Sequence, residues 1–212
     1  MNRWAEKLGL PAGGRALDLG CAVGGSSFEM AKRFAEVVGI DLSHTFVAKA
    51  AEMAAAGAIA YRLKVEGDLT EELTATVEPG VDASRLRFLQ GDACALPAGL
   101  GSFDAVLAAN LLCRVPSPAA CLEQIDAALA PGGLLVMTSP FTWLEEYTDK
   151  CAWVGGTHDA AGKPVRCADA LRAALAAKGY SVLQEDRMPL VIRETARKFQ
   201  IILAHRLVAR KA

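Results

Sequence analysis

A glycine-rich turn near the start of the chain has residue types and a spacing that could bind a ligand. Asp18 ends a short apolar run, and Gly20 and Gly24 continue the pattern D-x-G-x-x-x-G. A buried strand that enters such a turn presents the backbone N–H groups of the next helix to a ligand at the strand's carboxyl end. The dinucleotide fingerprint G-x-G-x-x-G needs a glycine two residues after Gly20, where Ala22 stands. The spacing therefore argues against a dinucleotide cofactor and against hydride transfer.

Three further groups of residues are expected at the same end of the predicted sheet. Asp41 and Leu42 follow the second strand, where a carboxylate can accept hydrogen bonds from the two hydroxyls of a ribose. Capping of the next helix is the alternative role for Asp41. The residues after the third strand are Gly91, Asp92 and Ala93, and a turn capped by Asp92 is the alternative there. Asn110 follows the fourth strand, at the centre of the crevice.

Apolar runs alternate with helical patterns along most of the chain, which predicts a mostly parallel α/β sheet covered on both faces. Right-handed crossovers leave few topologies for such a sheet. Ser26 is the expected cap of the first helix, and residues 131–133 (Pro-Gly-Gly) are expected to stop the third. The predicted helices cover residues 27–34, 44–56, 118–129 and 168–178. The predicted strands cover residues 15–19, 36–40, 86–89, 103–109, 134–138, 181–185 and 199–204.

Two segments interrupt this alternation inside what we expect to be a single domain over residues 1–212. Residues 59–84 have alternating charges and predict an inserted hairpin or excursion. Residues 141–164 follow the fifth strand and are rich in aromatic and acidic side chains. Because α/β sheets bind ligands at the carboxyl ends of their strands, the second segment is predicted to be a substrate lid.

Composition excludes several classes of protein. A length of 212 residues suits one α/β domain, and a net charge of −1 gives no general attraction to polyanions. Lys and Arg do gather after Met188, where a solvated strand end is expected and a nucleic-acid patch is the alternative. No apolar run reaches about 18 residues, and the first residues lack a signal-peptide core. The six cysteines and three histidines do not fall at metal-ligand spacings. We therefore expect a cytoplasmic protein without a metal, a membrane partner or a nucleic-acid partner.

The glycine turn, with the residues after the next three strands, resembles class I S-adenosylmethionine-dependent methyltransferases. The resemblance implies a Rossmann-like fold with a seven-stranded, mostly parallel sheet whose last strand is antiparallel. It implies S-adenosyl-L-methionine as cofactor, with Asp92 on the exocyclic amine of adenine and the next residue offering its N–H to the ring. Methyl donor and acceptor are then expected to meet at Asn110, which is therefore predicted to bind both the cofactor and the substrate.

Two later stretches, residues 138–148 (TSPFTWLEEYT) and 191–200 (VIRETARKFQ), are more specific than the fold. They resemble the methyltransferase domain of ovothiol biosynthesis, as do residues 91–94, 108–111 and 153–156. This resemblance implies methylation of the π-nitrogen of 5-thiohistidine to form ovothiol A. In many relatives the domain is fused to a sulfoxide synthase, and a longer segment precedes the first motif. About a dozen residues precede it here, so a shorter cover over the site, or a partner such as the synthase, is expected.

Groups suited to such an acceptor stand in these stretches. Arg193 is expected to bind a carboxylate or the thiolate, with pairing to Glu194 as the alternative. Glu145 or Glu146 is expected to meet the ammonium group, and Asn110 to orient the imidazole. Asn110, Arg193 and Glu145 are the predicted catalytic residues. The expected walls around the ring are Pro140, Trp143, Tyr147 and Trp153, with a core position as the alternative for Trp143.

Other functions stay open from the sequence. In the same class, the acceptor could be another small imidazole, a thiol or a carboxylate metabolite. In a different class, the chain could be a non-catalytic S-adenosylmethionine-binding partner of a sulfoxide synthase. An NAD(P)-dependent oxidoreductase is disfavoured by the missing middle glycine.

Overall fold

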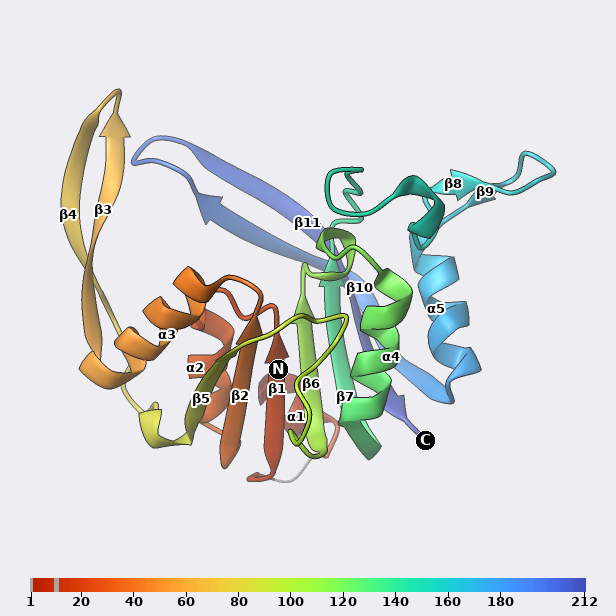
Figure 1. Cartoon of the computed structure of the whole chain (residues 1–212), viewed down its shortest axis with the longest axis horizontal. Coiled ribbons are helices and arrows are strands. Elements are labelled where there is room, and N and C mark those ends of the chain that lie inside the picture. The colour runs from red at the N-terminus through yellow and green to blue at the C-terminus, as the bar shows by residue number, and fades with distance from the viewer. Residues whose placement is uncertain (1, 10–11) are drawn as a thin grey trace.

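Seven strands form one sheet in the computed structural model, which describes residues 2–9 and 12–212 (Figure 1). The strand order is β10-β11-β7-β6-β1-β2-β5, and all neighbours are parallel except β11, which is antiparallel to both β7 and β10. The predicted seven-stranded sheet with an antiparallel last strand is confirmed. The strands are β1 (Arg15–Leu19), β2 (Glu36–Asp41), β5 (Leu86–Gln90), β6 (Phe103–Ala109), β7 (Leu129–Ser139), β10 (Tyr180–Arg193) and β11 (Phe199–Lys211).

Helices cover both faces of the sheet because successive strand residues point to opposite faces. One apolar cluster joins α2 to residues such as Ala16 and Val37, and the other joins α4 and α5 to residues such as Leu17 and Val38. The helices are α1 (Asn2–Lys7), α2 (Gly25–Ala31), α3 (His44–Ala56), α4 (Pro118–Ala128) and α5 (Cys167–Ala177). In the described part of the chain, no helix is long and apolar enough to cross a membrane.

The start of α2 differs from the prediction. Gly24, at φ 87°, is the N-cap residue, and Ser26 lies inside the helix without a capping role. A Cβ at Gly24 would lie 2.8 Å from Cζ of Phe88, so a glycine is needed both for the backbone angle and for the close approach. The side chain that ties α2 to the sheet is Ser27, whose hydroxyl donates to the buried carboxyl of Asp18 at 2.6 Å.

Some element boundaries match the prediction and others extend past it. α3 runs over His44–Ala56, as predicted, and ends at Gly57 in a left-handed C-cap. Its N-cap is Ser43, which the sequence pattern had not indicated, since Asp41 was the capping candidate. Residues 131–133 do not end a helix, because α4 ends at Ala128 and these residues lie within an irregular start of β7. β10 and β11 are also much longer than predicted. Pro189, which suggests a break, is accommodated in β10 because β10 is an edge strand of the sheet.

The outer halves of β10 and β11 extend beyond the carboxyl edge of the sheet. β7 pairs with β11 only between His205 and Arg210, and His205 is opposite Ser139, the last residue of β7. Residues 188–193 and 199–204 therefore project past the paired residues His205 and Ser139, by about 20 Å for six extended residues. Their large apolar side chains, including Val191 and Ile201, stay exposed because this hairpin extends past the helices that cover the sheet.

A second hairpin follows α3, on the side of the sheet where β5 is the edge strand, and it contacts the tip of the first hairpin. It consists of β3 (Ala58–Glu66) and β4 (Leu69–Thr76), inside the predicted insertion. The N–H of Ala196 donates to the carbonyl of Lys64 at 3.0 Å, and Arg197 pairs with Glu66 at 3.2 Å. Figure 1 shows the two hairpins meeting above the carboxyl edge of the sheet.

The segment predicted as a lid contains two small elements and is fixed at its base. A short turn of helix covers Lys150–Ala152, and β8 (Thr157–His158) pairs with β9 (Pro164–Val165). The hydroxyl of Thr148 donates to the carbonyl of Val115 at 2.6 Å, and the indole N–H of Trp153 donates to the carbonyl of Thr148 at 2.8 Å.

The buried carboxyl of Asp18 makes stability depend on pH. Burial raises its pKa to about 6, and the hydrogen bond from Ser27 offsets only part of this effect. The unfolded chain releases this proton near pH 4, so the folded state loses stability on account of this group as the pH rises from about 4 to about 6. Two pKa units correspond to about 3 kcal/mol.

We therefore predict that the difference in unfolding free energy between Asp18→Asn and the natural protein shifts in favour of the variant as the pH rises from about 4 to about 7. The shift should reach up to about 3 kcal/mol. Urea unfolding at several pH values measures this difference. Asp68→Asn, in the exposed turn between β3 and β4, is the control and should show no such trend. Parallel pH curves for the natural protein and Asp18→Asn would contradict the prediction.

Candidate functional site

A cavity of about 320 Å³ lies at the carboxyl ends of β1, β2 and β5. It brings together six of the residues predicted to bind a cofactor: Gly20, Asp41, Leu42, Gly91, Asp92 and Ala93. Tyr147, predicted as a substrate residue, also lines it. The remaining lining residues were not predicted from the sequence: Ile40, Phe46, Leu111, Arg114, Val115 and Pro116. Four of these belong to residues 111–116, the loop after β6, whose place after a central parallel strand was the available signal.

Asp41 joins two turns at this cavity. One carboxylate oxygen accepts the N–H of Ala22 at 2.8 Å, and the other accepts the N–H of Ser43 at 2.9 Å. The cap of α3 is Ser43, whose hydroxyl accepts the N–H of Phe46, so the alternative helix-cap role does not belong to Asp41. Each carboxylate oxygen keeps a lone pair for a further donor. Asp41 can therefore bind ribose hydroxyls while it holds the glycine turn.

Gly20 needs to be glycine for two reasons. Its φ is 74°, and a Cβ would lie 2.8 Å from Cδ1 of Leu111. The N–H groups of Gly20 and Cys21 both donate to the carbonyl of Ile40, at 2.8 and 3.1 Å. The turn is thereby kept close to the end of β2, where the cavity opens.

Asp92 forms a tight turn after β5. Its Oδ1 accepts the N–H of Cys94 at 2.8 Å, and its carbonyl accepts the N–H of Ala95 at 3.0 Å. The structure thus contains the turn capped by Asp92 that was the alternative to a role in binding. The second carboxylate oxygen of Asp92 stays available for a ligand. Its role toward adenine stays a prediction.

Asp18 and Gly24 support the cavity without lining it. Asp18 is only 1% exposed and is bonded to Ser27, so the structure places its carboxyl in the interior of the domain. Gly24 lies at the N-cap of α2 against Phe28 and Phe88. Both residues shape the turn, and direct contact of either with a cofactor stays a prediction.

Strained backbone is concentrated at the carboxyl edge of the sheet. The non-glycine residues with positive φ in the described part of the chain are Ala22, Asn110 and Phe141, at 48°, 56° and 51°. They follow β1, β6 and β7, three parallel neighbours in the sheet. Left-handed backbone at non-glycine residues costs energy and tends to occur at functional sites. Its distribution therefore marks this edge as the functional one.

Asn110 is held by the neighbouring strand. Its backbone N–H donates to the carbonyl of Thr138 at 2.8 Å, and its side-chain oxygen accepts the hydroxyl of Thr138 at 3.0 Å. Among the described residues, the side-chain NH₂ has no hydrogen-bond partner. The amide is thus oriented by its oxygen, while its two donors remain for a ligand.

The lid residues separate into two groups. Tyr147 lines the cavity, with the guanidinium of Arg114 5.2 Å from its ring centroid, and Arg114 also donates to the carbonyl and hydroxyl of Thr142. Trp143 does not wall an open site: it is 8% exposed and stacks on Trp153 in the core, with ring centroids 6.1 Å apart. The core alternative for Trp143 is the correct one, because the lid folds back onto α5 through its indole N–H and the sulfur of Cys167.

The other predicted acceptor residues do not gather at Asn110. Glu145 and Glu146 are exposed and line neither this cavity nor the hollow at Pro140, which lies beside the end of β7. Arg193 was expected to reach the crevice, but it lies at the tip of the β10–β11 hairpin. There its Nε donates to the carbonyl of Thr195 at 3.3 Å. The extra length of these strands carries it away, and the alternative pair does not form either, since Glu194 pairs with Lys198.

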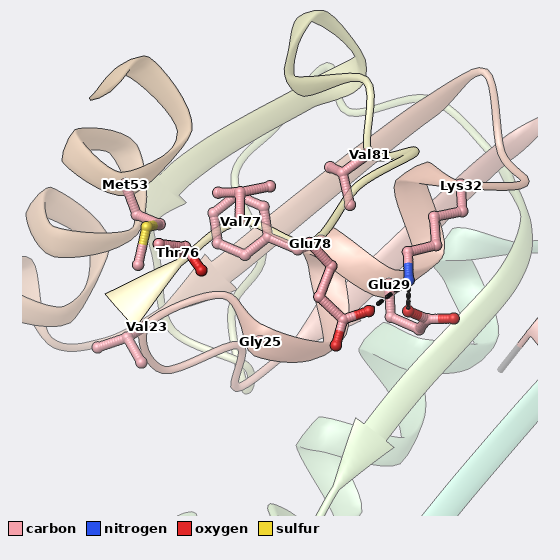
Figure 2. A pocket seen from close by; sticks show the side chains of 10 residues that line it. Val23, Gly25, Glu29, Lys32, Met53, Thr76, Val77, Glu78 and Val81 are labelled. Carbon is pink, nitrogen blue, oxygen red and sulfur yellow. Dashed lines mark hydrogen bonds and ion pairs between the residues drawn. The ribbon is translucent and has the colours of Figure 1, made fainter. Parts of the chain in front are cut away.

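A further cavity, of about 280 Å³, lies behind the glycine turn and is not lined by Asp41, Asp92 or Asn110. Figure 2 shows Val23 and Gly25 of the turn on one side of it, Met53 of α3 at one end, and Val77 and Val81 of the segment after β4 on the other side. Lys32 bridges Glu29 and Glu78 at 2.6 and 2.8 Å. These ion pairs connect the segment after β4 to α2.

Comparisons with known proteins find relatives with a methyltransferase domain. A family model described as a methyltransferase domain matches residues 17–137. A ubiquinone biosynthesis O-methyltransferase of Xanthomonas axonopodis pv. citri is 30% identical over 131 residues, which are 61% of this chain and 44% of that protein. A 2-methyl-6-phytyl-1,4-hydroquinone methyltransferase of Synechocystis is 30% identical over 138 residues, 65% of this chain and 35% of that protein. The chain thus spans less than half the length of these curated relatives.

A similar fold is found in solved structures. Magnesium protoporphyrin IX methyltransferase of Synechocystis, with bound S-adenosylmethionine, superposes with a TM-score of 0.59 at 18% identity. The superposition covers 99% of this chain and 76% of that one.

We predict that Asp41→Asn weakens the binding of S-adenosylhomocysteine, because the ribose hydroxyls lose a charged acceptor. A hydrogen bond to a charged group contributes about 1.5–3 kcal/mol, so Kd should rise about 10- to 100-fold. Isothermal titration calorimetry measures Kd, and a melting curve without ligand separates this effect from loss of the bond to Ala22 or Ser43. Asp68→Asn is the matched control, and an unchanged Kd for Asp41→Asn would remove Asp41 from the ribose site.

Proposed function

This chain belongs to the methyltransferase domain family, with S-adenosylmethionine as cofactor, and on that premise we propose that it methylates the π-nitrogen of 5-thiohistidine to form ovothiol A. The residues of the cavity support the donor half of this proposal. Leu42, Phe46 and Ala93 provide apolar surface for a purine, while Asp41 and Asp92 each keep acceptor capacity for hydroxyl and amine donors. When bound, the cofactor supplies a methyl group on a positively charged sulfur.

One observation carries the acceptor half. Residues 138–148, which resemble the ovothiol family, are bonded at both ends to the loop after β6. Thr138 bonds Asn110 at the start of that loop, and Thr148 bonds the carbonyl of Val115 near its end. Tyr147 of the same stretch lines the cofactor cavity. These bonds support the proposal, because they hold the stretch that resembles the ovothiol family beside Asn110, where we expect methyl donor and acceptor to meet.

The proposed reaction needs alignment more than it needs a base. A neutral imidazole nitrogen attacks with its own lone pair, the methyl–sulfur bond breaks with its electrons moving to sulfur, and the methylated ring then releases a proton to water. Holding the reacting atoms in line can supply about 7–11 kcal/mol of the barrier reduction. The thiolate of 5-thiohistidine is the stronger nucleophile, so the site has to keep it off the methyl axis. The free NH₂ donors of Asn110 are suited to hold the thiolate away from that axis.

Two other functions remain as alternatives. The two curated relatives act on quinone-type acceptors, and a different small imidazole, thiol or carboxylate would leave the donor site unchanged. A non-catalytic S-adenosylmethionine-binding partner of a sulfoxide synthase would bind cofactor without turnover. We propose a cytoplasmic location with a small-molecule substrate, and the synthase as the protein partner to test.

The proposed function predicts that the protein turns over 5-thiohistidine. Purified protein with S-adenosylmethionine carrying a ¹³C-methyl group should convert 5-thiohistidine to ovothiol A and S-adenosylhomocysteine, with the label on nitrogen by NMR. Histidine, which lacks the sulfur, is the matched acceptor control. Turnover on an unrelated acceptor with none on 5-thiohistidine would overturn the proposal. Cofactor binding without turnover, alone and with a sulfoxide synthase present, would support the non-catalytic alternative.

A further prediction concerns which atom of 5-thiohistidine is methylated. Asn110→Asp keeps the size of the side chain and tolerates the left-handed backbone, but it replaces the NH₂ donors by an acceptor. We expect kcat/KM to fall about 10- to 100-fold and part of the methyl label to move from nitrogen to sulfur. The Kd for S-adenosylhomocysteine should stay within about threefold, since Asn110 does not line the cofactor cavity. Unchanged kinetics and position of methylation would remove Asn110 from the acceptor site.

A further inference from the structure

A further hollow, of about 570 Å³, lies beside the carboxyl end of β7 and the amino end of the paired part of β11, at His205. Its walls come from the end of β7, from β8 and β9, from the first turn of α5 and from the row where β10 and β11 leave the sheet. The cofactor site does not use this hollow, although Pro140, one of the predicted substrate residues, is part of its lining.

The hollow has basic side chains and no acidic ones among its lining residues. Arg166, Arg187, His158 and His205 all line it. The acidic side chains near it are already paired: Glu185 pairs with His205 at 3.0 Å and with Arg172 at 3.1 Å, and Asp169 in the first turn of α5 pairs with Arg172. The local charge therefore favours an anionic ligand.

The two arginines are unpaired. Within residues 2–9 and 12–212, neither Arg166 nor Arg187 donates a side-chain hydrogen bond or forms an ion pair. The neighbouring Arg206, on the opposite face of β11, instead makes two hydrogen bonds to Asp186 at 2.8 and 2.7 Å. Two guanidinium groups that line one hollow without a counter-charge gain most from a shared oxyanion, which each can bind with two parallel N–H groups.

The first turn of α5 adds to this arrangement. Cys167 and Ala168 line the hollow, and the N-cap residue of the helix is Arg166, whose side chain makes no capping bond. The first N–H groups of a helix have no partner within the helix, and they carry partial positive charge. They therefore have the same preference for an anion as the two arginines.

The hollow adjoins the place where methyl transfer is proposed. Ser139 and Pro140 line it and directly follow Thr138, which is hydrogen-bonded to Asn110. The left-handed Phe141 places its ring 5.3 Å from the ring of His205, which lies opposite Ser139 in the sheet. A small acceptor held at Asn110 thus has this hollow as its neighbour on the side away from the cofactor cavity.

We propose that this hollow binds the carboxylate of the methyl acceptor, with Arg166 and Arg187 as the groups that hold it. The inference rests on the proposed function in one respect, which is that an amino-acid acceptor carries such a carboxylate. It replaces Arg193 in that role, because Arg193 lies six residues, about 20 Å, farther along the same strand than Arg187.

The first test compares two acceptors in three variants. Arg166→Ala and Arg187→Ala should each raise KM for 5-thiohistidine about 10- to 100-fold with little change in kcat. KM for the decarboxylated analogue, 5-thiohistamine, should already be high in the natural protein and should not change in the variants. Arg62→Ala, which removes the same charge from exposed β3, is the matched control. If wild-type and variant proteins share one KM for 5-thiohistidine, the subsite is wrong while the proposed function stands.

The second test does not need turnover. Succinate, a simple dicarboxylate, should raise the melting temperature of the natural protein and of Arg62→Ala, and this rise should be lost in the Arg166→Ala/Arg187→Ala double variant. Loss of the rise in a protein that fails to methylate 5-thiohistidine would support the anionic subsite and overturn the proposed acceptor. An equal rise in all three proteins would overturn the subsite.

Discussion

The carboxylate of Asp41 is the interaction on which the cofactor site depends. It accepts one N–H from the glycine turn after β1 and one from the turn after β2, so the two loops are held at a fixed separation. The carbonyl of Ile40 adds two further bonds to the glycine turn, and Asp18 holds the start of α2 from within the core. A carboxylate that is already oriented by two backbone donors can bind a ligand without losing further conformational freedom.

From this fixed point the functional edge extends across three parallel strands. Ala22, Asn110 and Phe141 each adopt left-handed backbone where a strand ends, and bonds from Thr138 and Thr148 fix the lid segment to the loop after β6. The cofactor cavity and the basic hollow therefore lie on two sides of Asn110. A methyltransferase needs this layout, because donor and acceptor have to approach one another in line from separate subsites.

The family membership and the acceptor rest on different parts of the chain. The family match ends at residue 137, and the names of the two curated relatives refer to ubiquinone biosynthesis and to a hydroquinone. In the proposal, the acceptor is selected by the elements after that residue, which are the lid, α5 and the β10–β11 hairpin. An acceptor subsite with unpaired arginines suits an acidic metabolite, whereas a quinone ring offers no carboxylate to bind them.

Most elements of the main sheet, and the residues of the proposed donor site, could be predicted from the sequence alone. Local signals, such as the glycine that ends α3 and the glycine turn, act between neighbours in the chain, so they could be interpreted without a structure. Only the tertiary structure decided which side chains lie beside the proposed acceptor position. The register of β11 on β7 puts Arg187, not Arg193, at the sheet edge, and packing on α5 buries Trp143. Register and packing depend on pairs of residues far apart in sequence, and a lengthened edge strand moves every side chain beyond it.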